Sequence, residues 1–483
     1  VSVLYWFLDS FDPFFHCNHS LPRIFQLKLS WQQQQHMLRR TIRKWNMSTP
    51  NAAAEFTDKY VSSGSAMKGG HATRSKTSIQ LSIETKRPGA LIEALKPFQE
   101  AGISITNVQN RPLAYESKAK YLTMFLDVEA HVEDAGMKRV IPFLQSTLPS
   151  VTVVGSWKTP WYPTEPQHLD LLDQSVLSAG EDLMDDPANP HPGFHDEAYK
   201  ARRRAIAASA RGHRHGMKIP RMEYTEQEKA TWTAVYDNLF HLFPTHACKQ
   251  FNSTLPLFAE NAGFCRTELP QLQDVSDYIE SQTGFTIRPV AGLLSSRDFF
   301  NALAFRIFFS TQYIRHHSQP LYTPEPDIVH EIIGHVPMMA DPDFADFCQK
   351  IGFASLGASD EVIEELGRCY WYSVEFGLCK QGGHVRAYGS GILSSAGELQ
   401  YCLSKEPQLL PWDPFVAAKM PFPITKYQPT YFVAEDFRDA AKKLEAWMDA
   451  QDRPFSIEYH PYTKTIRTFP KNTSEILGNL QKQ

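Results

Sequence analysis

The sequence lacks the features that mark secreted, membrane-spanning and nucleic-acid-binding proteins. Its seven cysteines form no CxxC pair and no disulfide-framework spacing, which favours free thiols in the reducing cytoplasm. No run of ~20 apolar residues is present, because Asp9 and Asp12 interrupt the apolar N-terminal segment, so we expect no membrane partner and no signal peptide. The 49 basic and 53 acidic residues nearly cancel to a formal net charge of −4. Without a concentrated basic surface, we expect no nucleic-acid partner.

At 483 residues the chain is too long for one ordinary core, so several domains are expected. It begins with Val1, and Met47 opens a segment that could be the true start. Residues 51–75 are rich in Ser, Gly, Ala and Thr, which is typical of a flexible tail. We therefore expect residues 1–75 to be a disordered or mis-annotated tail.

Residues 76–157 predict a small α+β domain. The segment SIQLSIET (78–85) alternates apolar and polar residues as a strand does, and a helix follows from Pro88 to Gly102. Two strands (103–110 and 121–130), a helix (132–145) and a last strand (151–157) complete the order βαββαβ, which is ferredoxin-like. The segment holds no cluster of histidines and carboxylates, so we expect a packing or dimerisation role.

Residues 158–455 predict a mainly α-helical domain. Thr225 and Glu228 have the spacing of a capping box, and apolar residues then recur at helical intervals. The aromatic-rich segments 298–315 and 360–379 predict two further long helices. The basic run 201–215 predicts a solvated helix face. Residues 456–483 predict a hairpin followed by one or two helical turns, a short oligomerisation segment.

Three residues of the helical domain could bind a metal ion. His330 and His335 lie in the segment HEIIGH, and Glu375 lies in an apolar, aromatic segment where a lone carboxylate is costly. Two imidazoles and one carboxylate, with open positions left over, form the facial triad of mononuclear non-haem Fe(II) oxygenases. The same residues could instead be a surface helix and an ordinary ion pair.

The spacing of the two histidines separates this segment from the zinc-protease motif. HExxH places its histidines four residues apart, about 40° around a helix, whereas a five-residue spacing separates them by about 140°. His330 and His335 can converge only if the helix widens into a π-type turn or breaks between them. Gly334 and Pro337 make such a break credible. A zinc peptidase is therefore disfavoured.

Long collinear segments carry a resemblance to a known family. They are RPVAGLLSSRDF (288–299), TQYIRH (311–316), YTPEPDIVHEIIGHVP (322–337), IGFASLGASDE (351–361), YWYSVEFGLCKQG (370–382) and GSGILSSAGELQYCLS (389–404). From about Thr77 onward the chain resembles the pterin-dependent aromatic amino acid hydroxylases. The resemblance implies a helical catalytic domain that holds Fe(II) and uses tetrahydrobiopterin and O₂ to hydroxylate an aromatic amino acid.

The resemblance also implies roles for individual residues. His330, His335 and Glu375 match the iron ligands, and Glu331 and Tyr370 match residues beside the pterin. The matches to the pterin-binding loop are Gly292, Leu294, Ser296 and Phe299. Arg315 matches the arginine that binds the substrate carboxylate, and Asp327 would hold it. The matches to the substrate pocket are Thr323, Trp371, Ser394 and Ser395, with Ser394 also expected to support a ligand histidine.

The residues near the pocket favour phenylalanine as the substrate. Trp371 and Tyr372 resemble the phenylalanine and tyrosine hydroxylases, whereas tryptophan hydroxylases have phenylalanine at the first position. Ile424 is apolar where tyrosine hydroxylases carry an acid. We therefore predict conversion of L-phenylalanine to L-tyrosine. A tryptophan hydroxylase is the alternative within the family, and an amino-acid-binding regulator without activity is the alternative outside the enzymes.

The module at residues 76–157 resembles the ACT domain that senses phenylalanine in this family. Gly89, Ala90 and Leu91 match its loop motif. The segment VQNRP (108–112) departs from the pattern, since regulated members carry an acid and a serine before Arg-Pro. The resemblance implies a homodimer or a homotetramer.

Overall fold

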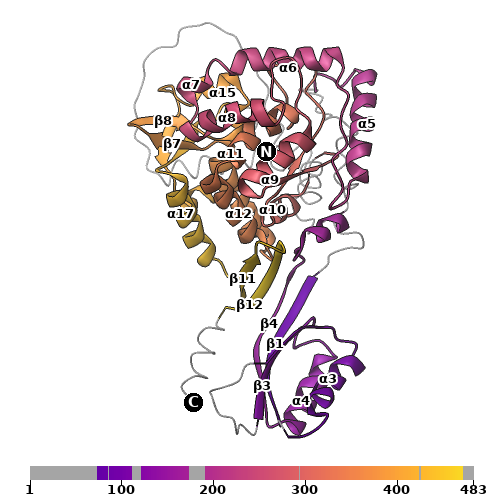
Figure 1. Ribbon diagram of the computed structural model, residues 1–483. Coiled ribbons are helices and arrows are strands. Elements are labelled where there is room, and N and C mark those ends of the chain that lie inside the picture. Colours follow the sequence, from indigo (N-terminus) through magenta and orange to yellow (C-terminus); the bar gives the residue numbers. More distant parts are fainter. Residues whose placement is uncertain are drawn as a thin grey trace, which may run out of the picture.

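The structure is a computed structural model that describes residues 73–84, 86–110, 121–172, 191–292, 294–423 and 426–471. A small α/β module and a larger helical part lie one above the other, and the long strands of the module reach towards the helical part (Figure 1). Within the described ranges, every helix is too short or too polar to cross a bilayer.

The N-terminal module has the order of elements that the sequence predicts. Its elements are β1 (Thr73–Glu84), α3 (Ala90–Glu100), β2 (Ile105–Asn110), β3 (Tyr121–Val128), α4 (Met137–Thr147) and β4 (Ser150–Pro160). The strands form one antiparallel sheet in the order β2-β3-β1-β4. This βαββαβ arrangement is the ferredoxin-like fold.

Alternating burial along β1 explains how the module forms its core. Ile79, Leu81 and Ile83 are buried, as the period of two along a strand requires. They pack with Ala94 and Phe98 of α3 in one cluster that also includes residues of β3 and α4. Gly102 has φ 67° just after α3, which is the left-handed conformation that ends many helices. The predicted glycine stop is confirmed.

Two boundaries of the module differ from the prediction. Strand β1 begins at Thr73, inside the segment predicted as tail, because residues 73–76 pair with the end of β4. The second helix begins at Met137 and not at 132, because the preceding residues form turns in which the Asp134 side chain accepts the His131 N–H. The remainder of the predicted tail lies outside the described residues.

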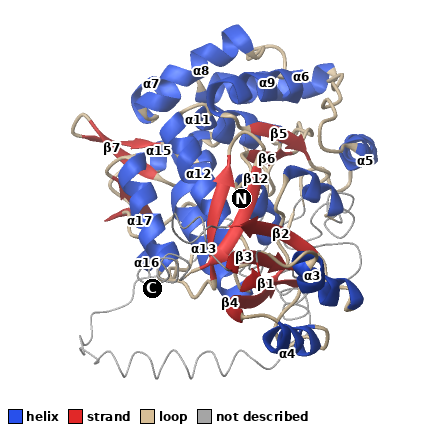
Figure 2. Cartoon of the chain, turned by 60° about the horizontal axis from the view of Figure 1, so that its bottom comes forward, coloured by secondary structure: helices blue, strands red, loops and turns tan. Residues whose placement is uncertain are grey.

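The larger part is mainly helical, as predicted, with few short strands (Figure 2). Its first helices are η1 (Pro166–Leu171), α5 (Glu197–Gly212), α6 (Glu226–Leu239), α7 (Phe243–His246), α8 (Lys249–Asn261), α9 (Leu272–Thr283) and α10 (Ser296–Leu303). Its central helices are η3 (His330–His335), α11 (Val336–Met339), α12 (Pro342–Ser355), α13 (Asp360–Tyr370) and η4 (Trp371–Glu375). Its last helices are α14 (Ser390–Leu393), α15 (Ala396–Tyr401), α16 (Pro414–Ala417) and α17 (Phe437–Asp449). One large apolar core joins these helices except α5, whose Ala207 and Ala210 form a small separate cluster with Ala291.

The short strands of this part form two small sheets. They are β5 (Thr286–Pro289), β6 (Ile307–Ser310), β7 (Leu378–Gln381), β8 (His384–Ala387), β9 (Gln408–Pro411) and β10 (Thr430–Ala434). Strands β5 and β6 pair in parallel, and the other four have the order β8-β7-β10-β9. Gly382 and Gly383 both have positive φ in the turn between β7 and β8, where other residues would be strained.

The capping box of α6 is confirmed, and one predicted helix is wrong. The Thr225 N–H donates to the Glu228 carboxylate at 2.7 Å, and the Glu228 N–H donates to Thr225 Oγ1 at 3.2 Å. The segment 298–315 is instead helix α10, then strand β6, then irregular chain. Arg306 adopts φ 54° between the two elements, and its guanidinium donates to Thr283 O. The apolar residues that follow pair with β5, so tertiary pairing overrides the local helical pattern.

A C-terminal hairpin connects the two parts. Strands β11 (Phe455–His460) and β12 (Thr465–Pro470) pair as predicted. Lys76 of β1 donates to Thr468 O at 2.6 Å, and the Ile466 N–H donates to Thr164 O at 2.8 Å. The predicted helical turns near the C-terminus lie outside the described residues.

Candidate active site

The segments that carry the three candidate metal ligands are both π-helical. Helix η3 spans the whole segment HEIIGH, and η4 ends at Glu375. The Val336 N–H donates to Glu331 O, and the Phe376 N–H donates to Trp371 O, so both hydrogen bonds span five residues. A turn of this width places residues five apart on one face. The predicted widening between the two histidines is confirmed.

The donor atoms of His330, His335 and Glu375 converge on one point. The two Nε2 atoms lie 3.1 Å apart. Glu375 Oε1 lies 3.2 Å from His335 Nε2, and Oε2 lies 3.5 Å from His330 Nε2. All three side chains are buried. Burial, opposed by the Glu375 charge, lowers the pKa of both histidines, which favours the neutral form that binds metals.

Two serines of α14 and its C-terminal end hold the donor atoms in place. Ser394 Oγ donates to Ser390 O at 2.7 Å, so it accepts from His330 Nδ1–H at 3.1 Å. This hydrogen bond directs the lone pair of His330 Nε2 at the other two donors. Ser390 Oγ donates to Glu375 Oε2 at 2.5 Å. One short element therefore orients one imidazole and the carboxylate.

Close backbone packing brings α14 against the π-helices. A Cβ on Gly334 would lie 2.7 Å from Ser390 O and 3.0 Å from Ser390 Cβ. A Cβ on Gly389 would overlap Glu375 O. These two glycines permit the approach on which the serine contacts depend.

The donor set fits a divalent iron ion. Two imidazole nitrogens and one carboxylate form the facial triad that Fe(II) oxygenases use. His335 Nδ1 is buried and has no hydrogen-bond partner among the described residues. The two Nε2 atoms, 3.1 Å apart, need a cation or a proton between their lone pairs. The Glu331 carboxylate also lies within 4.8 Å of both histidine donors.

A cavity of about 460 Å³ opens beside His330. Its lining residues are Arg315, Leu321, Tyr322, Thr323, Glu325, Pro326, His330, Phe376, Gly391, Ser394, Ser395, Glu398, Lys426 and Tyr427. The structure thus brings four predicted substrate residues, Arg315, Thr323, Ser394 and Ser395, to one cavity next to a predicted iron ligand. This volume is in the range of small-molecule sites.

Asp327 fixes Arg315 and the first ligand helix together. Its two carboxylate oxygens accept from Arg315 Nε at 2.9 Å and from Nη2 at 2.8 Å. Oδ1 also accepts the His330 N–H at 3.1 Å, as a helix N-cap does. The arginine is therefore rigidly placed relative to the metal ligands.

Comparison with known proteins assigns the family. The family model described as biopterin-dependent aromatic amino acid hydroxylase matches residues 160–483. Phenylalanine-4-hydroxylase of Caenorhabditis elegans is 46% identical over 406 residues, which is 82% of this chain and 87% of the relative. Phenylalanine-4-hydroxylase of Homo sapiens is 45% identical over 396 residues, which is 82% of this chain and 85% of the relative. The chain belongs to the biopterin-dependent aromatic amino acid hydroxylases.

A solved structure gives a further match to this hydroxylase. Phenylalanine hydroxylase from Chromobacterium violaceum, with bound iron(III) and 7,8-dihydrobiopterin, is 33% identical in sequence. The match covers 47% of this chain and 85% of that chain, with a TM-score of 0.44. The predicted family and enzyme class are confirmed by the sequence relatives.

Of the predicted pterin residues of the hydroxylase, Tyr370 and Glu331 lie beside the predicted iron ligands, and none of the six lines the cavity. The Tyr370 ring lies 6.3 Å from the His335 ring, nearly parallel to it, and 5.6 Å from the Phe299 ring, edge to face. Phe299 and Tyr370 are buried in the aromatic core. Gly292 and Leu294 are buried on the loop before α10, and Ser296 begins that helix.

Trp371 lies behind the cavity wall of the hydroxylase. Its ring lies 4.6 Å from the ring of Phe376, which lines the cavity, and stacks on Phe422 at 4.1 Å. Its indole N–H donates to Gln428 Oε1 at 3.0 Å. Trp371 therefore shapes the cavity from behind. Ile424 lies outside the described residues.

Three charged residues of the cavity, Glu325, Glu398 and Lys426, were missed from the sequence. The Glu325 carboxylate pairs with the buried Arg203 and with His191 Nε2, the latter at 3.2 Å. Burial is the largest single influence and would raise the pKa of Glu325, but Arg203 and His191 together outweigh it and lower this pKa to about 2. Arg203 belongs to the basic run predicted as a solvated face, so that prediction is wrong for this residue. A glutamate between two prolines was the only local signal.

Proposed function

We propose that this chain uses Fe(II), tetrahydrobiopterin and O₂ to hydroxylate L-phenylalanine to L-tyrosine. The observation that carries the proposal is the convergence of two imidazoles and one carboxylate from two π-helical turns. The curated relatives at 45–46% identity are phenylalanine-4-hydroxylases, which supports phenylalanine as the substrate. A regulator without activity fits less well, because the donor set and its serine supports are complete.

His330, His335 and Glu375 would hold the iron. Iron and reduced pterin together supply the activated oxygen that a hydroxylation requires. The chain's own contribution is to keep the ligands oriented. Ser394 keeps the His330 proton on Nδ1, and Ser390 keeps one Glu375 oxygen in place. The burial of all three ligands excludes bulk water.

The cavity would bind phenylalanine as a zwitterion. Arg315 lines it, and its guanidinium suits the substrate carboxylate. Glu325 also lines it, and its carboxylate, already paired with Arg203 and His191, would accept the substrate ammonium as a further donor. Thr323, Ser394 and Ser395 add hydroxyl groups to the lining. Phe376, backed by Trp371, offers an apolar face for the aromatic ring.

The pterin would bind on the other side of the ligands, near Glu331 and Tyr370. The loop that contains Gly292 and Leu294, together with Ser296 and Phe299, would form its walls. This assignment follows the resemblance of the sequence segments and the position of Tyr370 against His335.

The N-terminal module at residues 76–157 would be an ACT-like regulatory domain. Its strand order β2-β3-β1-β4 and the left-handed Gly89 at the start of α3 support this proposal. Arg111 and Pro112 of the departing segment VQNRP lie outside the described residues. We also propose a homodimer or homotetramer, with residues 456–483 contributing. A cytoplasmic location is supported by the six cysteines that are free in the described part of the chain.

Product analysis tests the proposed function. The purified chain with Fe(II) and reduced pterin should convert phenylalanine to tyrosine faster than it hydroxylates tryptophan or tyrosine. His330→Ala should lose iron and activity together. Faster turnover of tryptophan would favour the alternative within the family. Absence of bound iron with intact phenylalanine binding would favour the inactive regulator.

A further inference from the structure

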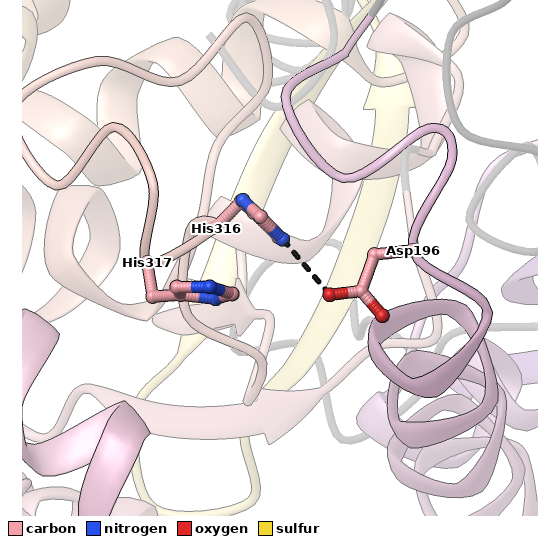
Figure 3. A group of neighbouring side chains, drawn as sticks. All are labelled: Asp196, His316 and His317. Carbon is pink, nitrogen blue, oxygen red and sulfur yellow. Dashed lines mark hydrogen bonds and ion pairs between the residues drawn. The ribbon is translucent and has the colours of Figure 1, made fainter.

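A second group of metal-binding side chains lies outside the active site. Asp196, His316 and His317 place one donor atom each within 4.8 Å of the others. Figure 3 shows the ring of His316 directed at the Asp196 carboxylate, with the His317 ring beside it. His316 Nε2 lies 3.2 Å from Asp196 Oδ2. The group joins the start of α5 to the segment that follows β6.

The Asp196 carboxylate has one oxygen engaged in the fold and one directed at the group. Oδ1 accepts the Tyr199 N–H at 3.0 Å and caps α5, which fixes the carboxylate. Oδ2 is the atom that faces His316. A cation at Oδ2 would therefore leave the helix cap intact.

The His316 imidazole is positioned to act as a ligand through Nε2. The ring is buried and meets the Tyr199 ring edge to face at 5.0 Å. Its Nδ1 lies 2.7 Å from Ser318 Oγ, which can accept the Nδ1 proton, and 3.3 Å from the Ser318 backbone nitrogen, whose N–H donates to Nδ1 in the other tautomer. In the tautomer with the proton on Nδ1, Nε2 and Asp196 Oδ2 both direct lone pairs at the same point, and this is the tautomer that a bound cation would select. A divalent cation satisfies both atoms, and the Ser318 contact is the support that metal-binding histidines commonly have.

His317 supplies the third ligand from the solvent side. Its ring centroid lies 4.1 Å from that of His316, and its side chain is exposed. One of its ring nitrogens lies within 4.8 Å of the donor atoms of Asp196 and His316. Water would complete the coordination of a site that is open on one side.

We propose that Asp196, His316 and His317 bind a divalent cation of the class that prefers imidazole ligands, such as Zn²⁺, Ni²⁺ or Cu²⁺. The cation links α5 to the chain segment of Arg315, which is already tied to α5 by the Tyr199 hydroxyl donating to Ile314 O at 2.9 Å. Because it binds the folded chain, it raises the free energy of unfolding by an amount that grows with the logarithm of the cation concentration above its dissociation constant. None of these three residues is a predicted iron ligand.

Zn²⁺ binding to the Fe(II)-loaded full chain tests the site. The test is equilibrium dialysis under anaerobic conditions, with zinc and iron measured in the same samples. We expect one zinc ion to bind per chain without loss of iron. His317→Ala and Asp196→Asn should each weaken the binding of this zinc ion by at least about tenfold, since losing a ligand costs no less than losing its support. Asparagine still caps α5, so Asp196→Asn removes the charge and keeps the fold. His241→Ala, an exposed histidine elsewhere, should leave zinc binding unchanged.

A variant of the active site separates this proposal from the proposed function. His330→Ala should lose iron and keep the zinc ion that depends on His317. Saturating Zn²⁺ should raise the midpoint of thermal unfolding in the parent chain and have a smaller effect in His317→Ala. Zinc that binds only by displacing iron would overturn the proposal. Zinc binding that is equal in the parent chain, His317→Ala and Asp196→Asn would also overturn it.

Discussion

Replacing Ser394 with alanine tests how the fold tunes its iron ligand. Ser394 Oγ accepts the His330 Nδ1 proton at 3.1 Å. His330 is buried, so the variant leaves a buried N–H without its acceptor, at a cost of about 1–3 kcal/mol to folding. Loss of the hydrogen-bond partner of a metal-binding histidine weakens metal binding by about 10–100-fold, or about 1.4–2.7 kcal/mol.

The assay is competition for Fe(II) with a chelator, together with denaturant unfolding of the iron-free chain. Ser355→Ala is the matched control, because Ser355 is also a buried serine whose hydroxyl donates within the fold, to Gly352 O at 2.7 Å. It should lose stability without a change in iron affinity. Equal iron affinity in Ser394→Ala and Ser355→Ala would refute the reasoning about the His330 proton.

Four further variants test the packing, charge and hydrogen bonding around the site. Gly334→Ala forces Ser390 away from η3, so we expect a loss of about 1–3 kcal/mol in the free energy of unfolding and weaker iron binding, measured by denaturant titration and iron content. Arg203→Gln leaves the buried Glu325 charge without its main partner, and denaturant titration should show a loss of about 3–5 kcal/mol. Arg203 and His191 together outweigh burial and lower the pKa of Glu325 from 4.5 to about 2, so the carboxylate stabilises the fold fully above about pH 4.5 and less as the pH falls towards 2. The difference in unfolding free energy between the parent chain and Glu325→Gln should therefore be constant above that range and shrink within it. Trp371→Phe removes the indole hydrogen bond behind the cavity, and we expect the ratio of tryptophan to phenylalanine turnover to rise in a competition assay.

The part of the active site that depends on the spacing of residues along the chain could be predicted from the sequence. The five-residue interval between His330 and His335 required a widened helix, and η3 is that helix. The contact between Ser394 and His330 followed from the resemblance of whole segments and not from any local pattern. The same resemblance predicted that Asp327 holds Arg315, and the two side chains form an ion pair in the structure.

Other features depend on contacts between distant residues and have no local signal. The segment 298–315 has helical periodicity, yet residues 307–310 pair with β5 and form strand β6. Arg203 lies among solvated basic residues and is buried only because Glu325, far along the chain, lies opposite. The alternation of charge and apolar residues in α5 cannot specify which arginine finds such a partner.

X-ray absorption spectroscopy of the Fe(II)-loaded chain tests the central claim most directly. The iron should be coordinated by two imidazoles and one carboxylate in the parent chain, and His335→Ala should leave a single imidazole on any iron that it retains. An iron centre without two histidine ligands, or one that is unchanged in His335→Ala, would contradict the assignment of His330, His335 and Glu375 as the catalytic metal site.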